Sequence, residues 1–183
     1  MKILSLSHKR LCSYRITHVL FLTLFSLPAW AHDLTINLTG KIYDATCTLS
    51  ADSTNKPVPM ATVSAKSFSQ PGNTTSPVKF TLNLENCATD MNGVEVTMAG
   101  AADANNPKLL ALDPASDTAT GIAIALQDED HTLIPVNGTS KLYSLNPQGG
   151  NATLVFYAEY MATGGEVSAG EADASATFSM IYP

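Results

Sequence analysis

Residues 33–42 read Asp33-Leu34-Thr35-Ile36-Asn37-Leu38-Thr39-Gly40-Lys41-Ile42, with polar and apolar residues in strict alternation. Successive side chains of a β-strand point to opposite faces, so Leu34, Ile36, Leu38, Gly40 and Ile42 would share one apolar face. Burying each of the four large side chains on that face is worth about 1.5–3 kcal/mol. The stretch is therefore either the first strand of its own domain or a strand that a neighbouring molecule buries.

The residues before this stretch have the layout of a secretory signal peptide. A basic start, which includes Arg10 and Arg15, precedes an apolar run over residues 19–27 and the cleavage pattern Ala29-Trp30-Ala31. The apolar run is too short to span a bilayer as a helix, although a membrane anchor is the alternative reading. We expect residues 1–31 to be removed during export and the mature chain to be soluble, with no direct insertion into a membrane.

Charge and cysteine content narrow the class of protein further. All acidic residues follow Ala31, no arginine follows Arg15, and the whole chain has a formal charge of −6. An acidic surface without arginine repels phosphate groups, which argues against nucleic acid or an anionic membrane as a partner. Cys47 and Cys87 are the two cysteines that follow the signal peptide, and in an exported chain they most simply form one disulfide, with two free thiols as the alternative.

The rest of the chain reads as short strands separated by turns rich in Gly, Pro and Asn. We expect extended segments at residues 58–65, 78–87, 94–98, 109–112, 122–127, 133–136, 142–145, 152–162 and 174–182. This spacing predicts an all-β sandwich without long helices. The last segment places Phe178, Met180 and Tyr182 on one face. If no strand of this chain pairs with the other edge of this segment, the chain has an extra strand at residues 33–42 and lacks a strand beside residues 174–182.

Taken together, these residues resemble the pilin subunits of the chaperone–usher pathway, in the type 1 fimbrial group. The alternating stretch resembles the donor strand of that family, and Cys47 and Cys87 match its single disulfide. Gly170, the fourteenth residue from the end, and the penultimate Tyr182 match its C-terminal signature, whereas the final Pro183 departs from the pattern. Residues 121–124 and 133–137 look more like a minor, tip-proximal adaptor than like the main shaft subunit.

The resemblance implies an incomplete immunoglobulin-like β-sandwich that lacks its last strand and is completed by a strand from a neighbour. It divides the chain into a signal peptide (1–31), an N-terminal donor-strand extension (32–43) and a pilin domain (44–183). A periplasmic chaperone would fill the groove first, and at the outer-membrane usher the extension of the adjacent subunit would replace it. Gly170, Phe178, Met180 and Tyr182 would border the acceptor groove on one side, with Ala45 and Leu49 on the other.

Alternative functions find less support in the sequence. His131 follows three acidic residues (128–130), which could suggest a cation or sugar site but is typical of an acidic β-turn. No catalytic constellation, metal-ligand set or cofactor motif is recognisable, so we do not expect an enzyme. A carbohydrate-binding adhesin subunit, or a small periplasmic β-domain with another role, remains as an alternative to a fimbrial subunit that supports cell adhesion.

Overall fold

The computed structural model describes residues 46–183. The predicted signal peptide (1–31) and the predicted extension (32–43), including Leu34, Ile36, Leu38, Gly40 and Ile42, lie outside the described residues, as does Ala45. Within the described part, no helix has the length and apolar character needed to cross a membrane.

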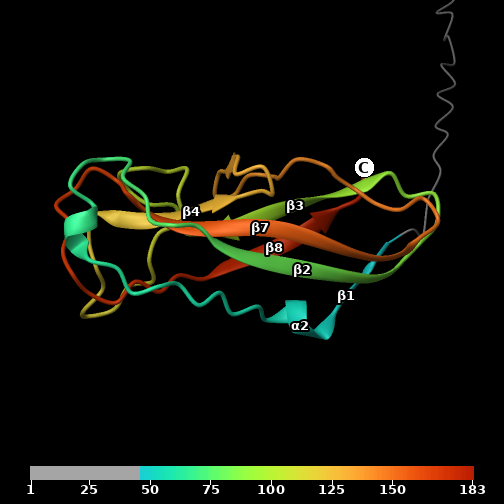
Figure 1. Ribbon diagram of the computed structural model, residues 1–183, viewed down its shortest axis with the longest axis horizontal. Helices are drawn as coiled ribbons and strands as arrows, with labels where there is room; N and C mark the ends of the chain where they lie inside the picture. The colour runs from blue at the N-terminus through green and yellow to red at the C-terminus, as the bar shows by residue number, and fades with distance from the viewer. Residues whose placement is uncertain (1–45) are drawn as a thin grey trace, which may run out of the picture. The chain divides into compact units, whose positions relative to one another are not determined.

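The described residues form two antiparallel sheets, as the strand pattern predicts (Figure 1). The first sheet has the order β1 (Thr48–Leu49), β2 (Val78–Cys87), β7 (Gly150–Ala162), β4 (Ile122–Gln127) and β5 (Leu133–Ile134). The second has the order β6 (Tyr143–Ser144), β3 (Gly93–Gly100) and β8 (Ala176–Ile181). Helical structure is confined to the short helix α2 (Ala51–Thr54) and the 3-10 turn η1 (Ala65–Ser67). The prediction of an all-β sandwich is confirmed.

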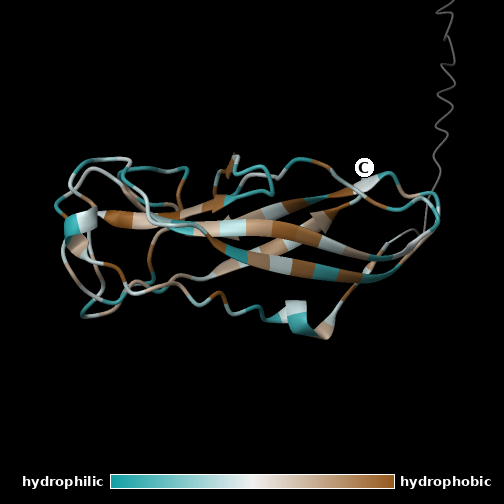
Figure 2. Cartoon of the chain, viewed as in Figure 1, coloured by the Kyte–Doolittle hydropathy of each residue, from teal (hydrophilic) through white to brown (hydrophobic). Residues whose placement is uncertain are grey.

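The core lies between the two sheets and consists of the alternate residues that each sheet turns inward. Leu82 and Leu84 of β2 and Phe156 of β7 are almost fully buried, and Val94 and Val96 of β3 meet them from the second sheet. Figure 2 shows how hydrophobic residues alternate with more polar ones along β2 and β7. This alternation fixes the register of the long β2–β7 pair, because a shift by one residue would expose the buried face.

A disulfide joins Cys47, just before β1, to Cys87, at the end of β2. The bond closes a loop with a sequence separation of 40 residues, which includes α2 and the whole segment that leads to β2. Its removal should therefore increase the freedom of the unfolded chain considerably.

Replacing Cys47 and Cys87 together with serine should lower the free energy of unfolding by about 4 kcal/mol, from the entropy of loop closure. Guanidinium unfolding of the oxidised chain and of the double variant would measure the difference in midpoint. The wild-type chain after reduction should match the double variant. Equal midpoints for the oxidised chain and the double variant would show that the bond does not stabilise the fold.

Candidate functional site: a groove beside the last strand

The last strand of the described chain has a partner on one side only. β8 pairs with β3 along its length, from Ala176 opposite Gly100 to Ile181 opposite Glu95. Within residues 46–183, no strand pairs with the other edge of β8. An open edge presents unpaired backbone N–H and C=O groups and is a site for the addition of another strand.

A groove of about 1000 Å³ runs beside this open edge. Residues 172–176 and Phe178 form one wall, and residues 54–60, which follow α2, form the other. Figure 1 shows the segment after α2 running beside the chain that enters β8. The floor consists of core side chains from both sheets, namely Phe80, Leu82, Met98, Leu126, Ala158 and Tyr160. The groove therefore opens the interior of the sandwich to its surroundings.

A second cavity of about 380 Å³ extends the groove past the start of β8. Met60, Tyr160, Ala172 and Asp173 line both cavities, so the two are adjacent. The side chains that pack on the core but remain partly exposed are concentrated along these walls, among them Val58, Met60, Phe80, Ala172, Ala174 and Phe178. An added apolar strand would remove this surface from water.

Tyr182, which follows β8, contacts the chain just before β1. Its hydroxyl accepts a hydrogen bond from the backbone N–H of Cys47 at 3.3 Å and lies 3.5 Å from the sulfur of Met180. Met180 and Tyr182 are half-buried and pack against the core, as Leu49 of β1 does. Of the residues expected to border the groove, Phe178 and Gly170 lie in its walls, whereas Met180 and Tyr182 lie next to the bridge to β1.

Gly170 lies where two backbones come together at the far end of the second cavity. A Cβ atom at this position would lie 2.6 Å from the backbone nitrogen of Ala119. The next residue, Glu171, donates its N–H to the carbonyl of Asp117 at 2.9 Å and accepts from the N–H of Ala119 at 2.8 Å. Glycine is required here because any side chain would push apart the two segments that form this end of the groove.

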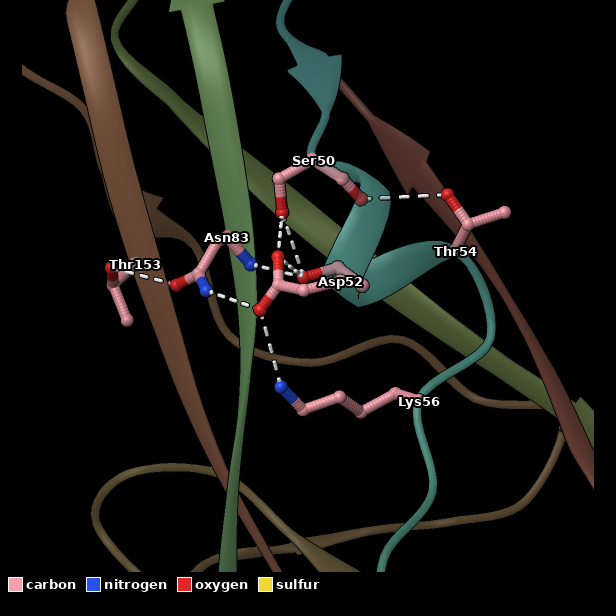
Figure 3. Close-up of polar contacts among 7 residues, drawn as sticks. Ser50, Asp52, Thr54, Lys56, Asn83 and Thr153 are labelled. Atoms are coloured by element: carbon pink, nitrogen blue, oxygen red, sulfur yellow. Dashed lines mark hydrogen bonds and ion pairs between the residues drawn. The ribbon is translucent and has the colours of Figure 1, made fainter.

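A polar network, which no local pattern in the sequence indicates, holds the wall formed by residues 54–60 in place (Figure 3). The buried hydroxyl of Ser53 accepts the backbone N–H of Asn83 at 2.8 Å, and the Asn83 side chain donates to Asp52 at 3.0 Å. Hydrogen bonds from Ser50 and Asn83, with Lys56 nearby, outweigh a desolvation effect of opposite sign and hold the pKa of Asp52 below its ordinary value. These contacts attach α2 to β2 and so determine the position of residues 54–60, which follow α2.

The acidic segment before His131 forms a turn between β4 and β5. The buried carboxylate of Asp128 accepts the backbone N–H groups of Asp130 and Thr132, each at 2.9 Å, and the His131 ring stacks on Tyr157. Within the described residues, no group of three or more His, Cys, Asp or Glu side chains is arranged to hold a metal ion. The carboxylate of Asp128 thus has a structural role in shaping the turn.

Comparison with known proteins places the chain in a family. The fimbrial protein family matches residues 36–183. The fimbrial-like protein YcbV of Escherichia coli K12 is 38% identical over 170 residues, covering 92% of this chain and 98% of that protein. The fimbrial-like protein FimF of Salmonella typhimurium is 36% identical over 166 residues, covering 90% and 92%. The chain belongs to the fimbrial protein family, whose members are structural proteins and not enzymes.

Solved structures agree with this assignment. A type I fimbria protein of Burkholderia pseudomallei superposes with a TM-score of 0.58 at 35% identity, covering 76% of this chain and 91% of that one. A subunit of a chaperone–usher pilus gives a TM-score of 0.63 at 20% identity, covering 86% and 99%, and so shares the fold. The prediction of an immunoglobulin-like sandwich of the pilin type is confirmed.

Proposed function

We propose that this chain is a structural subunit of a surface fimbria and polymerises by strand donation. The observation that carries the proposal is the edge of β8, which is unpaired within the described residues and lies beside an apolar groove. In this reading the groove accepts the N-terminal extension of an adjacent subunit, and residues 32–43 of this chain fill the groove of the next. Main-chain pairing with β8 supplies affinity, and the alternate apolar side chains supply partner choice.

The chemistry of the extension matches that of the groove. Leu34, Ile36, Leu38 and Ile42 recur at every second position, apart from Gly40. A strand of nine residues is about 30 Å long, which is enough to extend along the wall formed by residues 54–60. Gly40 would lie where a side chain has no room. Burial of the four large side chains would cover the partly exposed core residues of the acceptor.

Export and chaperone binding would precede assembly of the subunit into a fimbria. The predicted signal peptide (1–31) would direct the chain to the periplasm, where a chaperone strand would occupy the groove until assembly. At an outer-membrane usher, the donor strand of the adjacent subunit would replace the chaperone strand, and the subunit would become part of the fimbria at the cell surface. An exposed apolar groove next to an open strand edge would otherwise promote aggregation.

The chain purified from the periplasm of cells that carry its assembly genes should elute as a one-to-one complex with a two-domain chaperone. The open groove makes a free subunit unfavourable in water, because core side chains such as Phe80 and Phe178 would stay exposed. Size-exclusion chromatography with mass spectrometry of the eluted complex would give the composition. A chaperone-free monomer whose thermal unfolding does not change with added peptide 32–43 would contradict the proposal.

We also propose a minor, tip-proximal position for this subunit, on the basis of residues 121–124 and 133–137, which form parts of β4 and β5 and their flanks. Immunogold labelling with an antibody specific for this chain should mark the distal ends of fimbriae. An antibody against the main shaft subunit provides the control, because it should label the full length. Uniform labelling of the shaft by the first antibody would show that the subunit is not confined to the tip.

A further inference from the structure

Charged residues are unevenly distributed along the groove. Asp113, Glu171 and Asp173 are exposed and lie at the end where the chain enters β8. Lys56, on the opposite wall, is the basic lining residue, and its ammonium group lies 3.4 Å from the carboxylate of Asp52. The three carboxylates have no ion-pair partner within residues 46–183. One end of the groove is therefore negatively charged and not neutralised by the described chain.

Backbone and side-chain contacts hold the segment of Asp113 against the segment of Asp173. The N–H of Asp113 donates to the carbonyl of Asp173 at 2.7 Å, and Ser175 donates its hydroxyl to the Asp113 carboxylate at 2.8 Å. Burial raises the pKa of Tyr160, and the charges of Asp173 and Glu171 raise it further, as expected if both carboxylates lie near its hydroxyl. Asp173 and Glu171 thus flank Ala172, whose carbonyl accepts a hydrogen bond from the Tyr160 hydroxyl at 3.0 Å.

The orientation of an added strand determines which of its residues meet this acidic end. Every strand pair in both sheets is antiparallel. A strand added antiparallel to β8 places its carboxyl end beside the start of β8, where Asp173 and Glu171 lie. In the extension of this chain, the carboxyl end of the apolar pattern carries Lys41 between Gly40 and Ile42, whereas the amino end carries Asp33.

We propose that the acidic end of the groove selects donor strands with a basic residue next to the last apolar anchor, and that residues 34–42 of a second copy of this chain qualify through Lys41. This inference rests on the proposed strand donation and adds its charge requirement. Lys41 belongs to the polar side of the strand and would face the rim, where Asp113, Glu171 and Asp173 are exposed. Pairs at an exposed rim act mainly on the association rate and are screened by salt.

A labelled peptide of residues 32–43 tests the proposal when the mature chain is refolded in its presence. We expect the Lys41→Glu peptide to associate about tenfold more slowly than the wild-type peptide at low salt, and the difference to vanish near 1 M salt. An acceptor chain with Asp173→Lys should lose most of the preference between the two peptides, because its acidic end then carries two negative charges and one positive charge. An acceptor with Glu85→Lys is the matched control, because Glu85 is an exposed acid of β2 outside the groove walls, and it should keep the wild-type preference.

The outcomes separate this inference from the function on which it rests. Equal association rates of the two peptides at low salt would overturn the charge requirement and leave strand donation intact. An equal loss of preference in the Glu85→Lys acceptor would also overturn it, since the effect would then come from net charge alone. If neither peptide associates with the wild-type chain, strand donation itself is wrong, and the charge requirement is wrong with it.

Discussion

A chain that lacks residues 32–39 should bind the chaperone normally and yet be unable to join the groove of another subunit. The deletion removes Leu34, Ile36 and Leu38, each worth about 1.5–3 kcal/mol when buried, which corresponds to at least a thousandfold loss in affinity for an acceptor. Its own groove has residues 54–60 as one wall and residues 172–176 with Phe178 as the other, and it should be unaffected. Gel electrophoresis without heating, which preserves strand-exchanged polymers, would reveal the absence of a polymer ladder.

A substitution control separates the apolar pattern from chain length. Serine at Leu34, Ile36 and Leu38 should reproduce the deletion, whereas serine at the alternate positions Thr35, Asn37 and Thr39 should leave the ladder unchanged. The two triple variants have the same length and differ only in which face of the strand they alter. A ladder from the deleted chain that equals the wild-type ladder would show that the extension is not the donor.

The sequence predicts the strands best where one face of a sheet is buried and the other is exposed. The runs expected at 78–87 and 152–162 correspond to β2 and β7, because their alternation is visible. In β4, Ile122 and Ile124 belong to the core between the sheets, and Ala123 and Ala125 on the other face are also buried, against Leu109. Alanine is found on both buried and exposed faces of a strand. The positions of Ala123 and Ala125 in the sequence therefore do not indicate that Leu109 covers them.

The wall formed by residues 54–60 is the part of the site that the sequence predicts least well. The sequence predicts an extended segment over residues 58–65, but the structure has no strand between β1 and β2. Pro57 and Pro59 have no N–H to donate, so regular pairing is not available there. The contact that positions this wall joins Ser53 to Asn83, which lie 30 residues apart, and no local pattern indicates such a contact.

Replacing Ala174 with aspartate should abolish acceptance of a donor strand while leaving donation intact. Ala174 is half-buried in the groove wall and packs against the core, so an incoming strand would cover its side chain. An aspartate is too short to reach solvent past that strand, and burying an unpaired carboxylate costs several kcal/mol, or at least a hundredfold in affinity. Binding of labelled peptide 32–43 to the refolded variant would measure the loss.

Thr177→Asp is the matched control for this variant. Thr177 lies in β8, is exposed, pairs with Ala99 and is not part of the groove wall. Both substitutions add the same charge near the same edge, and Thr177→Asp has in addition a cost in strand propensity, because Thr177 lies within β8. We expect the Thr177 variant to bind the peptide as the wild type does. Equal loss in the two variants would attribute the effect to damage of β8, and unchanged binding by the Ala174 variant would mean that the donor does not lie over this wall.

A mixture of the two defective chains provides the most restrictive test, because each variant keeps the function that the other has lost. The chain without residues 32–39 retains an acceptor groove, and the Ala174→Asp chain retains a donor strand. Neither should polymerise alone, and together they should form a one-to-one dimer that cannot extend, because the dimer has no free donor and its remaining groove is blocked. Longer species in the mixture would require a contact between subunits other than strand donation into the groove beside β8.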